Sequence, residues 1–134
     1  PRDMQTDPRY DDVVAEVREF LARRTDAAVA AGVLAERIIV DPGIGFGKTL
    51  EHNLALLAGT GRLASLGRPV LVGPSRKRFL GELTGQGQPE QRVVATTAAC
   101  LAAWVRGASV FRVHDVSALV QAMAVWRAVD GVTR

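Results

Sequence analysis

The sequence predicts an α/β protein built on a parallel β-sheet, and two observations carry this prediction. Three short apolar runs, rich in β-branched side chains, read as buried strands: residues 37–40, 69–72 and 109–113. Their ends near Val40, Val72 and Val113 are 32 and 41 residues apart, and each interval holds one helix. Apolar strands separated by single helices are typical of a parallel sheet with covered faces. Three strands complete neither a Rossmann sheet nor a barrel, so further strands are expected outside this chain.

Two helices flank the first strand. Residues 11–31 have a charged face, Gly32 follows them as a C-cap, and their apolar side chains at helical spacing are Val13, Val17, Phe20 and Leu21. Residues 49–66 end before Gly67 and carry one apolar stripe, which comprises Leu50, Leu54 and Leu57.

Two more helices are expected after the second and third strands. Residues 90–106 end before Gly107, and their predicted inward face comprises Val94, Thr97, Ala98, Leu101 and Val105. Asp115 or Ser117 can cap the last helix, whose apolar side chains are Leu119, Met123 and Trp126. Cys100, the one cysteine, rules out an internal disulfide and is interpreted as a small core residue.

The composition is that of an ordinary globular domain. The 134 residues are 48% hydrophobic and 23% charged, with a net charge of +3. No apolar run approaches the ~18 residues that cross a bilayer, and the basic residues are spread along the chain, so neither membrane nor nucleic-acid binding is expected. Of seventeen basic residues, only Lys48 and Lys77 are lysines, and both lie in glycine-containing segments. A single cysteine is compatible with a reducing cytoplasm.

A glycine-rich segment, residues 41–49, follows the first strand. Its Gly-Lys-Thr ending resembles a phosphate-binding P-loop, but Pro42 stands where that motif needs its first glycine. Asp41, at the end of a buried strand, can accept paired hydrogen bonds from an amino-heterocycle such as 2-aminopyrimidinone. Glycines such as Gly45 let a flat ring approach the backbone, and Phe46 can form an aromatic wall. The alternative, that Asp41 only caps the loop, stays open.

A basic segment, residues 73–81, follows the second strand. Its three consecutive cations, Arg76 to Arg78, repel one another and need an anionic partner, unless solvent alone screens them. A loop at the end of a buried strand that opens towards a helix N-terminus is well suited to bind anions. Lys77 can place a point charge beside a ring carbonyl, and Ser75 and Arg78 are candidates for binding a carboxylate.

Arg112 and His114 close the third strand. Side chains alternate along a strand, so these two are expected on one side and Val113 on the other. Arginine and histidine side by side can clamp a diphosphate through charge-assisted hydrogen bonds. His52, near the start of the helix after the glycine-rich segment, is interpreted as bracing that loop. Because parallel strands open on one face at their carboxyl ends, the three segments are expected to share a single site.

Taken together, these segments resemble the dihydropteroate synthase family. The matching motifs, in chain order, are Asp-Pro-Gly-Ile-Gly-Phe-Gly-Lys-Thr at 41–49, Ser-Arg-Lys at 75–77 and Arg-Val-His-Asp at 112–115. Met4, Gln5 and the helix from Asp11 also resemble the family's segment after its fifth strand. The resemblance covers essentially the whole chain. It implies that residues 1–134 are the C-terminal portion of one pterin-binding (β/α)8 TIM-barrel domain, about three βα units that hold strands 6–8.

The resemblance implies an activity and a set of site residues. Members condense 6-hydroxymethyl-7,8-dihydropterin diphosphate with p-aminobenzoate to 7,8-dihydropteroate and diphosphate in folate biosynthesis, and sulfonamides compete with p-aminobenzoate. Asp41 and Lys77 would hold the pterin, Phe46 and Ser75 would border the p-aminobenzoate site, and the diphosphate would be held by Arg112 and His114. The implied catalytic residues are Lys77, Arg112 and His114. The implied substrate-binding residues are Asp41, Gly45, Phe46, Gly73, Ser75, Arg76, Lys77, Arg78, Arg112 and His114.

The family's N-terminal half is absent from this chain. That half carries the asparagine that ligates Mg²⁺, two mobile loops and further pterin ligands. The chain alone is therefore expected to be inactive, to supply no metal ligand and to need that half. The family also implies a homodimer in the cytoplasm. Arg78 stands where some members have serine, which leaves the contact to the p-aminobenzoate carboxylate open.

Two other interpretations remain. One is a non-catalytic pterin-binding paralogue or fragment, against which the joint retention of Asp41, Lys77, Arg112 and His114 speaks. The other is a corrinoid-linked methyltetrahydrofolate methyltransferase that shares the pterin-binding barrel. The Ser-Arg-Lys and Arg-Val-His-Asp loops disfavour it, because methyl transfer releases no diphosphate.

Overall fold

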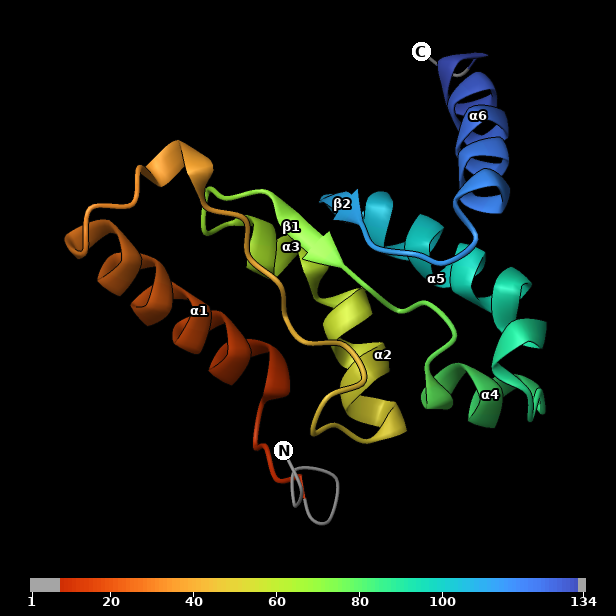
Figure 1. Ribbon diagram of the computed structural model, residues 1–134, viewed down its shortest axis with the longest axis horizontal. Coiled ribbons are helices and arrows are strands. Elements are labelled where there is room, and N and C mark those ends of the chain that lie inside the picture. Colours follow the sequence, from red (N-terminus) through yellow and green to blue (C-terminus); the bar gives the residue numbers. More distant parts are fainter. Residues whose placement is uncertain (1–7, 133–134) are drawn as a thin grey trace.

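A computed structural model describes residues 8–132, in which helices alternate with short strands (Figure 1). Met4 and Gln5 lie outside the described residues. The elements in chain order are α1 (Val13–Ala30), the 3₁₀ turn η1 (Ala35–Arg37), α2 (Leu50–Ala58), α3 (Thr60–Ala64), β1 (Val70–Val72), α4 (Arg78–Thr84), the 3₁₀ turn η2 (Pro89–Arg92), α5 (Val93–Trp104), β2 (Ala108–Phe111) and α6 (Val116–Val132).

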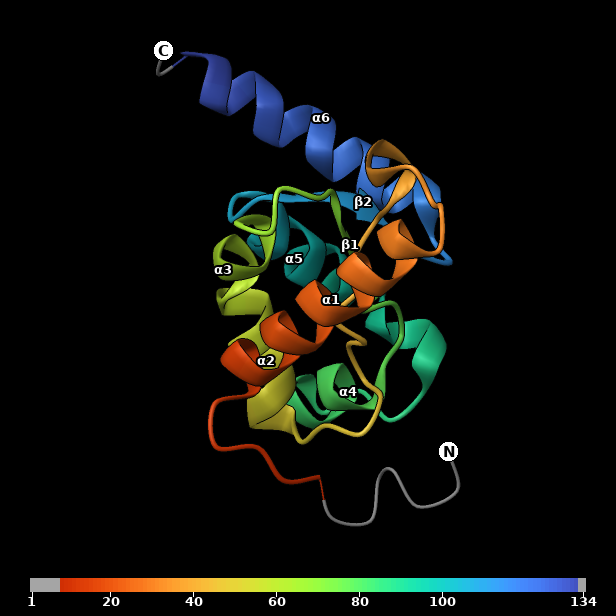
Figure 2. The same cartoon turned by 90° about the vertical axis from the view of Figure 1, so that its left-hand side faces the viewer.

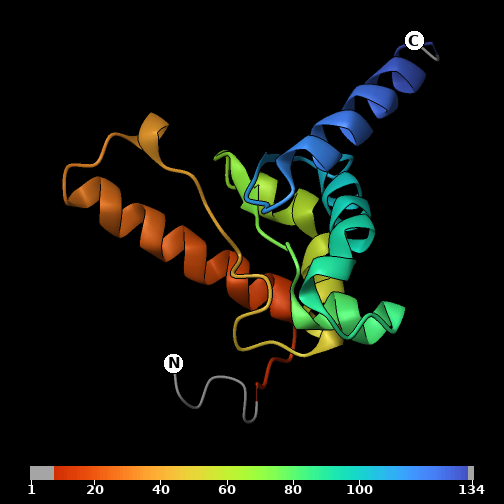
Figure 3. The same ribbon diagram turned by 45° about the vertical axis from the view of Figure 1, so that its right-hand side comes forward.

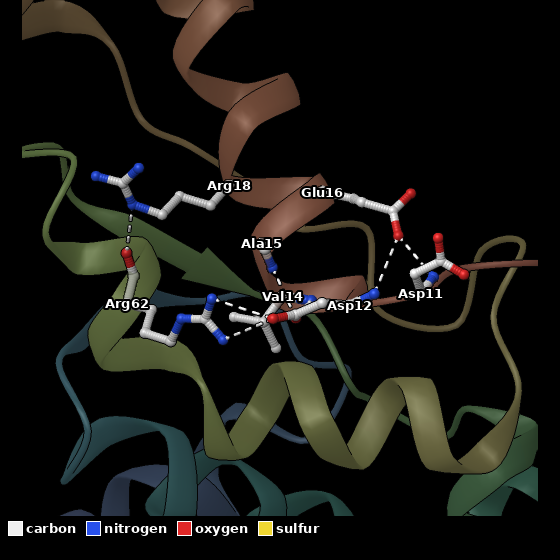
Figure 4. A network of polar contacts seen from close by, with 7 residues as sticks. All are labelled: Asp11, Asp12, Val14, Ala15, Glu16, Arg18 and Arg62. Atoms are coloured by element: carbon white, nitrogen blue, oxygen red, sulfur yellow. Dashed lines mark hydrogen bonds and ion pairs between the residues drawn. The ribbon is translucent and has the colours of Figure 1, made fainter.

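Helix α1 confirms the helix predicted at 11–31 apart from its ends, and Asp12 caps it. Of its predicted apolar side chains, Phe20 is exposed and the other three are buried. The Asp12 carboxylate accepts hydrogen bonds from the N–H groups of Val14 and Ala15, at 3.0 and 2.9 Å (Figure 4). Glu16 accepts in return from the Asp12 N–H at 3.2 Å. The other Asp12 oxygen is 3.2 Å from the guanidinium of Arg62 in α3, so the same carboxylate ties the start of α1 to that helix.

Strands β1 and β2 pair in parallel, as the sequence predicts. Val70 lies opposite Ala108, and Val72 lies opposite Phe111, with one irregularity in the register after Val70. Helix α3 packs against both strands and α5 packs against β2. The crossover between the two strands therefore runs through α4 and α5, the connection that a parallel pair requires.

The strand predicted at 37–40 is wrong in extent. Its pairing among residues 8–132 is a single parallel bridge from Val40 to Val70, in which the Val40 carbonyl accepts from the N–H of Leu71 at 2.8 Å. The 3₁₀ turn η1 takes up the start of the run, and Ile39 is 52% exposed.

The helix predicted at 49–66 is two helices, α2 and α3, which meet at Gly59. A Cβ on Gly59 would lie 2.7 Å from a methyl group of Val14, so α1 packs directly against the backbone at this break. Leu54, expected in the apolar stripe, is exposed. The buried side chains of α2 are instead Asn53, Leu56 and Leu57.

The predicted inward face of α5 is wrong. Val94 is 81% exposed and Val105 is also exposed. Small side chains, one or two turns apart, face the core instead: Thr96, Ala99, Cys100 and Ala103. They let the helix approach the sheet closely, and the larger apolar residues are left on the outer faces. Cys100 is fully buried, which confirms it as a small core residue, and burial raises the pKa of its thiol to about 12.

Helix α6 starts directly after Asp115 and projects from the rest of the chain (Figures 2 and 3). Of its predicted apolar side chains, Leu119 is buried, Met123 is half-buried and Trp126 is exposed. No helix among the described residues is both long enough and apolar enough to span a bilayer.

Candidate functional site

Three loops follow the three strand ends, and we call residues 41–49, 73–78 and 112–115 the first, second and third loops. Asp41 and Arg112 bring the first and third loops together, with 3.7 Å between Oδ2 and Nη2. Lys77 of the second loop reaches the first, with its Nζ 3.6 Å from the ring centroid of Phe46. The predicted convergence of Asp41, Lys77 and Arg112 on one side of the molecule is therefore confirmed, while their roles stay predictions.

The second and third loops, with Phe46 of the first, enclose a cavity of about 350 Å³, called the small cavity here. Its lining residues are Phe46, Gly73, Ser75, Lys77, Arg112, Val113 and His114. That volume falls in the range of sites for small molecules. A larger cavity of about 570 Å³ opens between α1 and the first loop, and Asp41 lines it with Tyr10 and Phe20. Asp41 thus lines the large cavity while its Oδ2 faces Arg112 of the small one.

The first loop is closed by its own hydrogen bonds. Oδ1 of Asp41 accepts from the N–H of Gly43 at 2.8 Å, and the carbonyl of Gly43 accepts from Phe46 at 3.1 Å. Gly43 and Gly45 have φ angles of 71° and 79°, the left-handed region that glycine adopts without strain. Asp41 therefore does cap the loop, as the simpler alternative holds, but with one oxygen only.

Asn53 anchors the first loop from α2. It is 2% exposed, its Oδ1 accepts from the N–H of Gly45 at 2.6 Å, and its Nδ2 donates to the carbonyl of Thr49 at 2.6 Å. The predicted bracing role of His52 is confirmed. Its ring Nδ1 accepts from the backbone N–H of Thr49, and its backbone N–H donates to the Thr49 hydroxyl, both at 3.2 Å. Lys48 donates to the carbonyl of Phe46 at 3.0 Å.

Gly45 and Lys77 fit against each other across two loops. A Cβ on Gly45 would lie 2.7 Å from Cδ of Lys77, so the lysine stem runs over bare backbone before its ammonium reaches Phe46. Burial lowers the pKa of the Lys77 ammonium and the nearby Arg112 lowers it further, while Asp41 opposes both. The absence of a side chain at Gly45 is thus what admits Lys77 to this position.

The second loop leads into α4, as predicted for a basic loop that opens a helical turn. Arg76 does not project freely into the small cavity, because its guanidinium makes two hydrogen bonds to Asp115, at 3.1 and 2.9 Å. These bonds lower the pKa of the Asp115 carboxyl. Arg78 is almost fully exposed, pairs with Glu82 at 2.7 Å and is not among the residues that line the small cavity.

The third loop starts earlier than predicted, because β2 ends at Phe111 and not at Val113. The N–H of Arg112 still bonds to the carbonyl of Val72 at 3.2 Å, and beyond it the chain leaves the sheet towards Ser75. Ser75 makes two contacts with His114: its hydroxyl accepts from the backbone N–H at 3.1 Å and lies 2.8 Å from Nδ1. Arg112 and His114 line the same cavity, as predicted. Val113 lines it too, so side-chain alternation along a strand does not explain why the first two lie together.

Sequence reasoning assigned no role to three buried polar residues that support the loops: Asn53, Arg92 and Thr96. Each lies in or beside an apolar helical stretch. A polar residue in such a stretch indicates a buried hydrogen bond, and this signal could have identified them. Within residues 8–132 there is no cluster of three or more acidic, histidine or cysteine side chains able to hold a metal ion.

The fold and this site define an α/β protein with polar loops gathered where parallel strands end, the usual position of ligand sites in such folds. Residues 1–114 match the sequence model of the family described as pterin binding enzyme, and the chain belongs to that family.

The similar proteins and solved structures include several dihydropteroate synthases. That of Neisseria meningitidis serogroup B is 48% identical over 131 residues, which are 96% of this chain and 46% of the relative. The Xanthomonas albilineans enzyme, solved in complex with 7,8-dihydropteroate, superposes with a TM-score of 0.90 at 56% identity over 92% of this chain and 47% of that one. The Thermus thermophilus enzyme in complex with 4-aminobenzoate superposes with a TM-score of 0.89 at 50% identity, over 94% of this chain and 48% of that one. The chain therefore spans about half the length of the relatives it matches.

Proposed function

We propose that the protein that carries this chain is a dihydropteroate synthase, which joins 6-hydroxymethyl-7,8-dihydropterin diphosphate to p-aminobenzoate and releases diphosphate. The observation that carries the proposal is the meeting of Asp41, Lys77 and Arg112 from three separate loops, in a chain that belongs to the pterin-binding family. A carboxylate, an ammonium and a guanidinium at one rim match a ligand with an amino-substituted ring and an anionic tail.

In this proposal Asp41 and Lys77 hold the pterin ring. Oδ1 of Asp41 is taken by the first loop, so Oδ2 accepts from the ring's amino group. The contact of Oδ2 to Arg112 is long at 3.7 Å, and the Arg112 side chain is 66% exposed, so little is lost when the ring displaces it. Lys77 sets its charge beside the ring carbonyl, and Phe46 and Ser75 border the p-aminobenzoate.

Arg112 and His114 are proposed to bind the diphosphate. Ser75 holds His114 through its backbone N–H and Nδ1, which leaves Nε2 as the ring nitrogen able to meet a phosphate oxygen. When the bond between the pterin methylene carbon and the diphosphate oxygen breaks, the leaving group takes the electron pair, and these side chains stabilise its charge. The p-aminobenzoate nitrogen then bonds to the methylene carbon and loses a proton. The protein contributes charge stabilisation and the orientation of two flat rings.

The remaining parts of the proposal lie outside this chain. Val40, β1 and β2 would correspond to strands 6–8 of a (β/α)8 barrel whose other strands come from a segment beyond residues 1–134, and the chain alone would be inactive. Mg²⁺ is proposed to be bound through that segment, because the resemblance places the metal-ligating asparagine there, and no step is assigned to it here. The cytoplasmic homodimer and competition by sulfonamides remain predictions.

The test is diphosphate release with both substrates present, measured for residues 1–134 and for the full-length protein. We expect turnover only in the full-length protein. Its Arg112→Ala variant should lose most of the turnover. An Arg106→Ala control should keep it, because Arg106 is exposed just beyond the end of α5. A folded full-length protein with no turnover would refute the proposal. Pterin binding without turnover would favour a non-catalytic paralogue, and turnover of methyltetrahydrofolate a methyltransferase.

A further inference from the structure

Arg76 has an unusual backbone conformation at the centre of the second loop. Its φ is 58°, and among residues 8–132 it is the one non-glycine residue in the left-handed region. A residue with a side chain persists there only where its surroundings fix it. The turn around it is closed by a hydrogen bond from the Lys77 N–H to the carbonyl of Pro74, at 3.1 Å.

Arg76 is held at its backbone N–H, at its carbonyl and at its guanidinium. Its N–H donates to the hydroxyl of Thr96 at 3.0 Å, and its carbonyl accepts from the guanidinium of Arg92 at 2.9 Å. Its own guanidinium is paired with Asp115. Thr96 lies in the first turn of α5, and Arg92 directly precedes that helix. The N-terminal end of α5 therefore hydrogen-bonds to the peptide groups on both sides of Arg76.

Arg92 is a buried cation held by carbonyl groups. It is 8% exposed, and its guanidinium donates to the carbonyls of Arg76, Gln86 and Gly87. Gly81 lies flat against it, since an added Cβ would be 2.6 Å from Nε of Arg92. A planar group with several donors is needed to reach three carbonyls at once, which a lysine does not offer.

We propose that Thr96 and Arg92 are positioning residues for Lys77, which act by locking the Arg76 backbone. The peptide group between Arg76 and Lys77 sets the direction in which the Lys77 side chain leaves the backbone. If Arg76 relaxes to the ordinary right-handed or extended region, the lysine stem leaves Gly45 and its ammonium leaves Phe46. The inference rests on the proposed function in so far as Lys77 binds the pterin.

The test uses conservative variants of Thr96 in the full-length protein, because Thr96→Val removes the hydroxyl and keeps the shape while Thr96→Ser keeps the hydroxyl. The dissociation constant of the pterin diphosphate is measured by calorimetry, with and without Lys77→Ala. We expect Thr96→Val to weaken binding by roughly three- to tenfold, the effect of one hydrogen bond, and Thr96→Ser to restore it. In the Lys77→Ala background the same change should have no effect. An equal loss in both backgrounds, or no loss in either, overturns the inference.

Arg92→Lys gives a second, independent variant should Thr96→Val fail to fold, with Arg106→Lys as its matched control outside the site. Arg92→Lys should weaken pterin binding in the Lys77 background alone, and the control should leave it unchanged. A folded Arg92→Lys variant with wild-type affinity contradicts the inference.

A readout that needs no substrate separates this inference from the proposed function. The Lys77 amine is titrated by NMR after isotopic methylation, with its signal assigned by its loss in Lys77→Ala. Freed from Gly45 and Arg112, Lys77 should titrate at higher pH in Thr96→Val and Arg92→Lys than in the wild type. If the wild type binds no pterin, the proposed function fails, and this titration still decides the positioning. An unchanged titration in both variants overturns it.

Discussion

The second and third loops differ from the first loop in what holds them. Ser75 and Arg76 of the second loop bond to His114 and Asp115 of the third, and α5 fixes the same turn from behind. The first loop instead bonds to itself and to α2, chiefly through Asn53. Its contacts to the other two loops include a long ion pair and a lysine that packs over Gly45 and the ring of Phe46.

This difference separates two tasks of the proposed site. On the cationic side, the second and third loops are bonded directly to each other, and donors held in this way need little rearrangement to stabilise a leaving anion. The acidic side stands on a separately braced loop, so a ring can enter between Asp41 and Arg112 by disrupting a weak contact. Changes to either side should therefore affect different parts of the substrate.

The largest expected effect comes from breaking the first loop at Asn53. Asn53→Leu removes the buried side chain that accepts from the Gly45 N–H and donates to the Thr49 carbonyl, and it keeps only the backbone bond from the N–H of residue 53 to that carbonyl, so it should cost about 2–4 kcal/mol of unfolding free energy. Urea denaturation measures the loss, with Gln121→Leu on the surface of α6 as the control. Binding of inorganic diphosphate should survive in the folded variant while pterin binding falls. Equal loss of both would erase the distinction between the loops.

Removing a cation tests the two tasks directly. Lys77→Ala should weaken binding of the pterin ring and Arg112→Ala that of the diphosphate, each by about 1.5–3 kcal/mol, as for a lost charged hydrogen bond. Calorimetry with a pterin that lacks the diphosphate tells them apart, since only Lys77→Ala should lower its affinity. Unchanged binding constants in both variants would show that the two assignments are wrong.

A smaller effect separates the backbone of Arg76 from its side chain. Arg76→Gly and Arg76→Ala both lose the pair to Asp115, but only glycine tolerates φ of 58° without strain. The glycine variant should be more stable than the alanine variant by about 0.5–1 kcal/mol, after allowance for its more flexible unfolded chain. Thermal unfolding of the pair measures this, and a more stable alanine variant would mean that the turn relaxes freely.

The smallest effect is a dependence of stability on pH. Hydrogen bonds from Arg76 hold the pKa of Asp115 below its ordinary value. A carboxyl with a depressed folded-state pKa contributes stability above the ordinary aspartate pKa of about 3.9, and that contribution is lost as the pH falls through the depressed value. Asp115→Asn should therefore flatten the acid side of the stability profile, whereas Asp26→Asn on the exposed face of α1 should not. Profiles of stability against pH that are parallel for the two variants would count against the Arg76–Asp115 ion pair.

The parts of the fold that the sequence predicts are those set by local pattern and strand direction. Helix α1 follows from its apolar spacing, and the meeting of Asp41, Lys77 and Arg112 follows because parallel strands end on one side. The face of α5 does not follow, because the helix is apolar nearly all round and its partner surface decides that Thr96 faces inward. The shortened strand at Val40 depends on which neighbours pair with it, and the lock on Arg76 joins residues up to 39 positions apart.

The most direct test is a structure of the full-length protein with 6-hydroxymethyl-7,8-dihydropterin diphosphate bound. The assignments predict the ring's amino group within hydrogen-bond distance of Asp41 Oδ2, the ring carbonyl beside Lys77 Nζ, and phosphate oxygens on Arg112 and Nε2 of His114. A ligand that contacts only one of the three loops, or a diphosphate bound at Arg78 on the exposed start of α4, would contradict them.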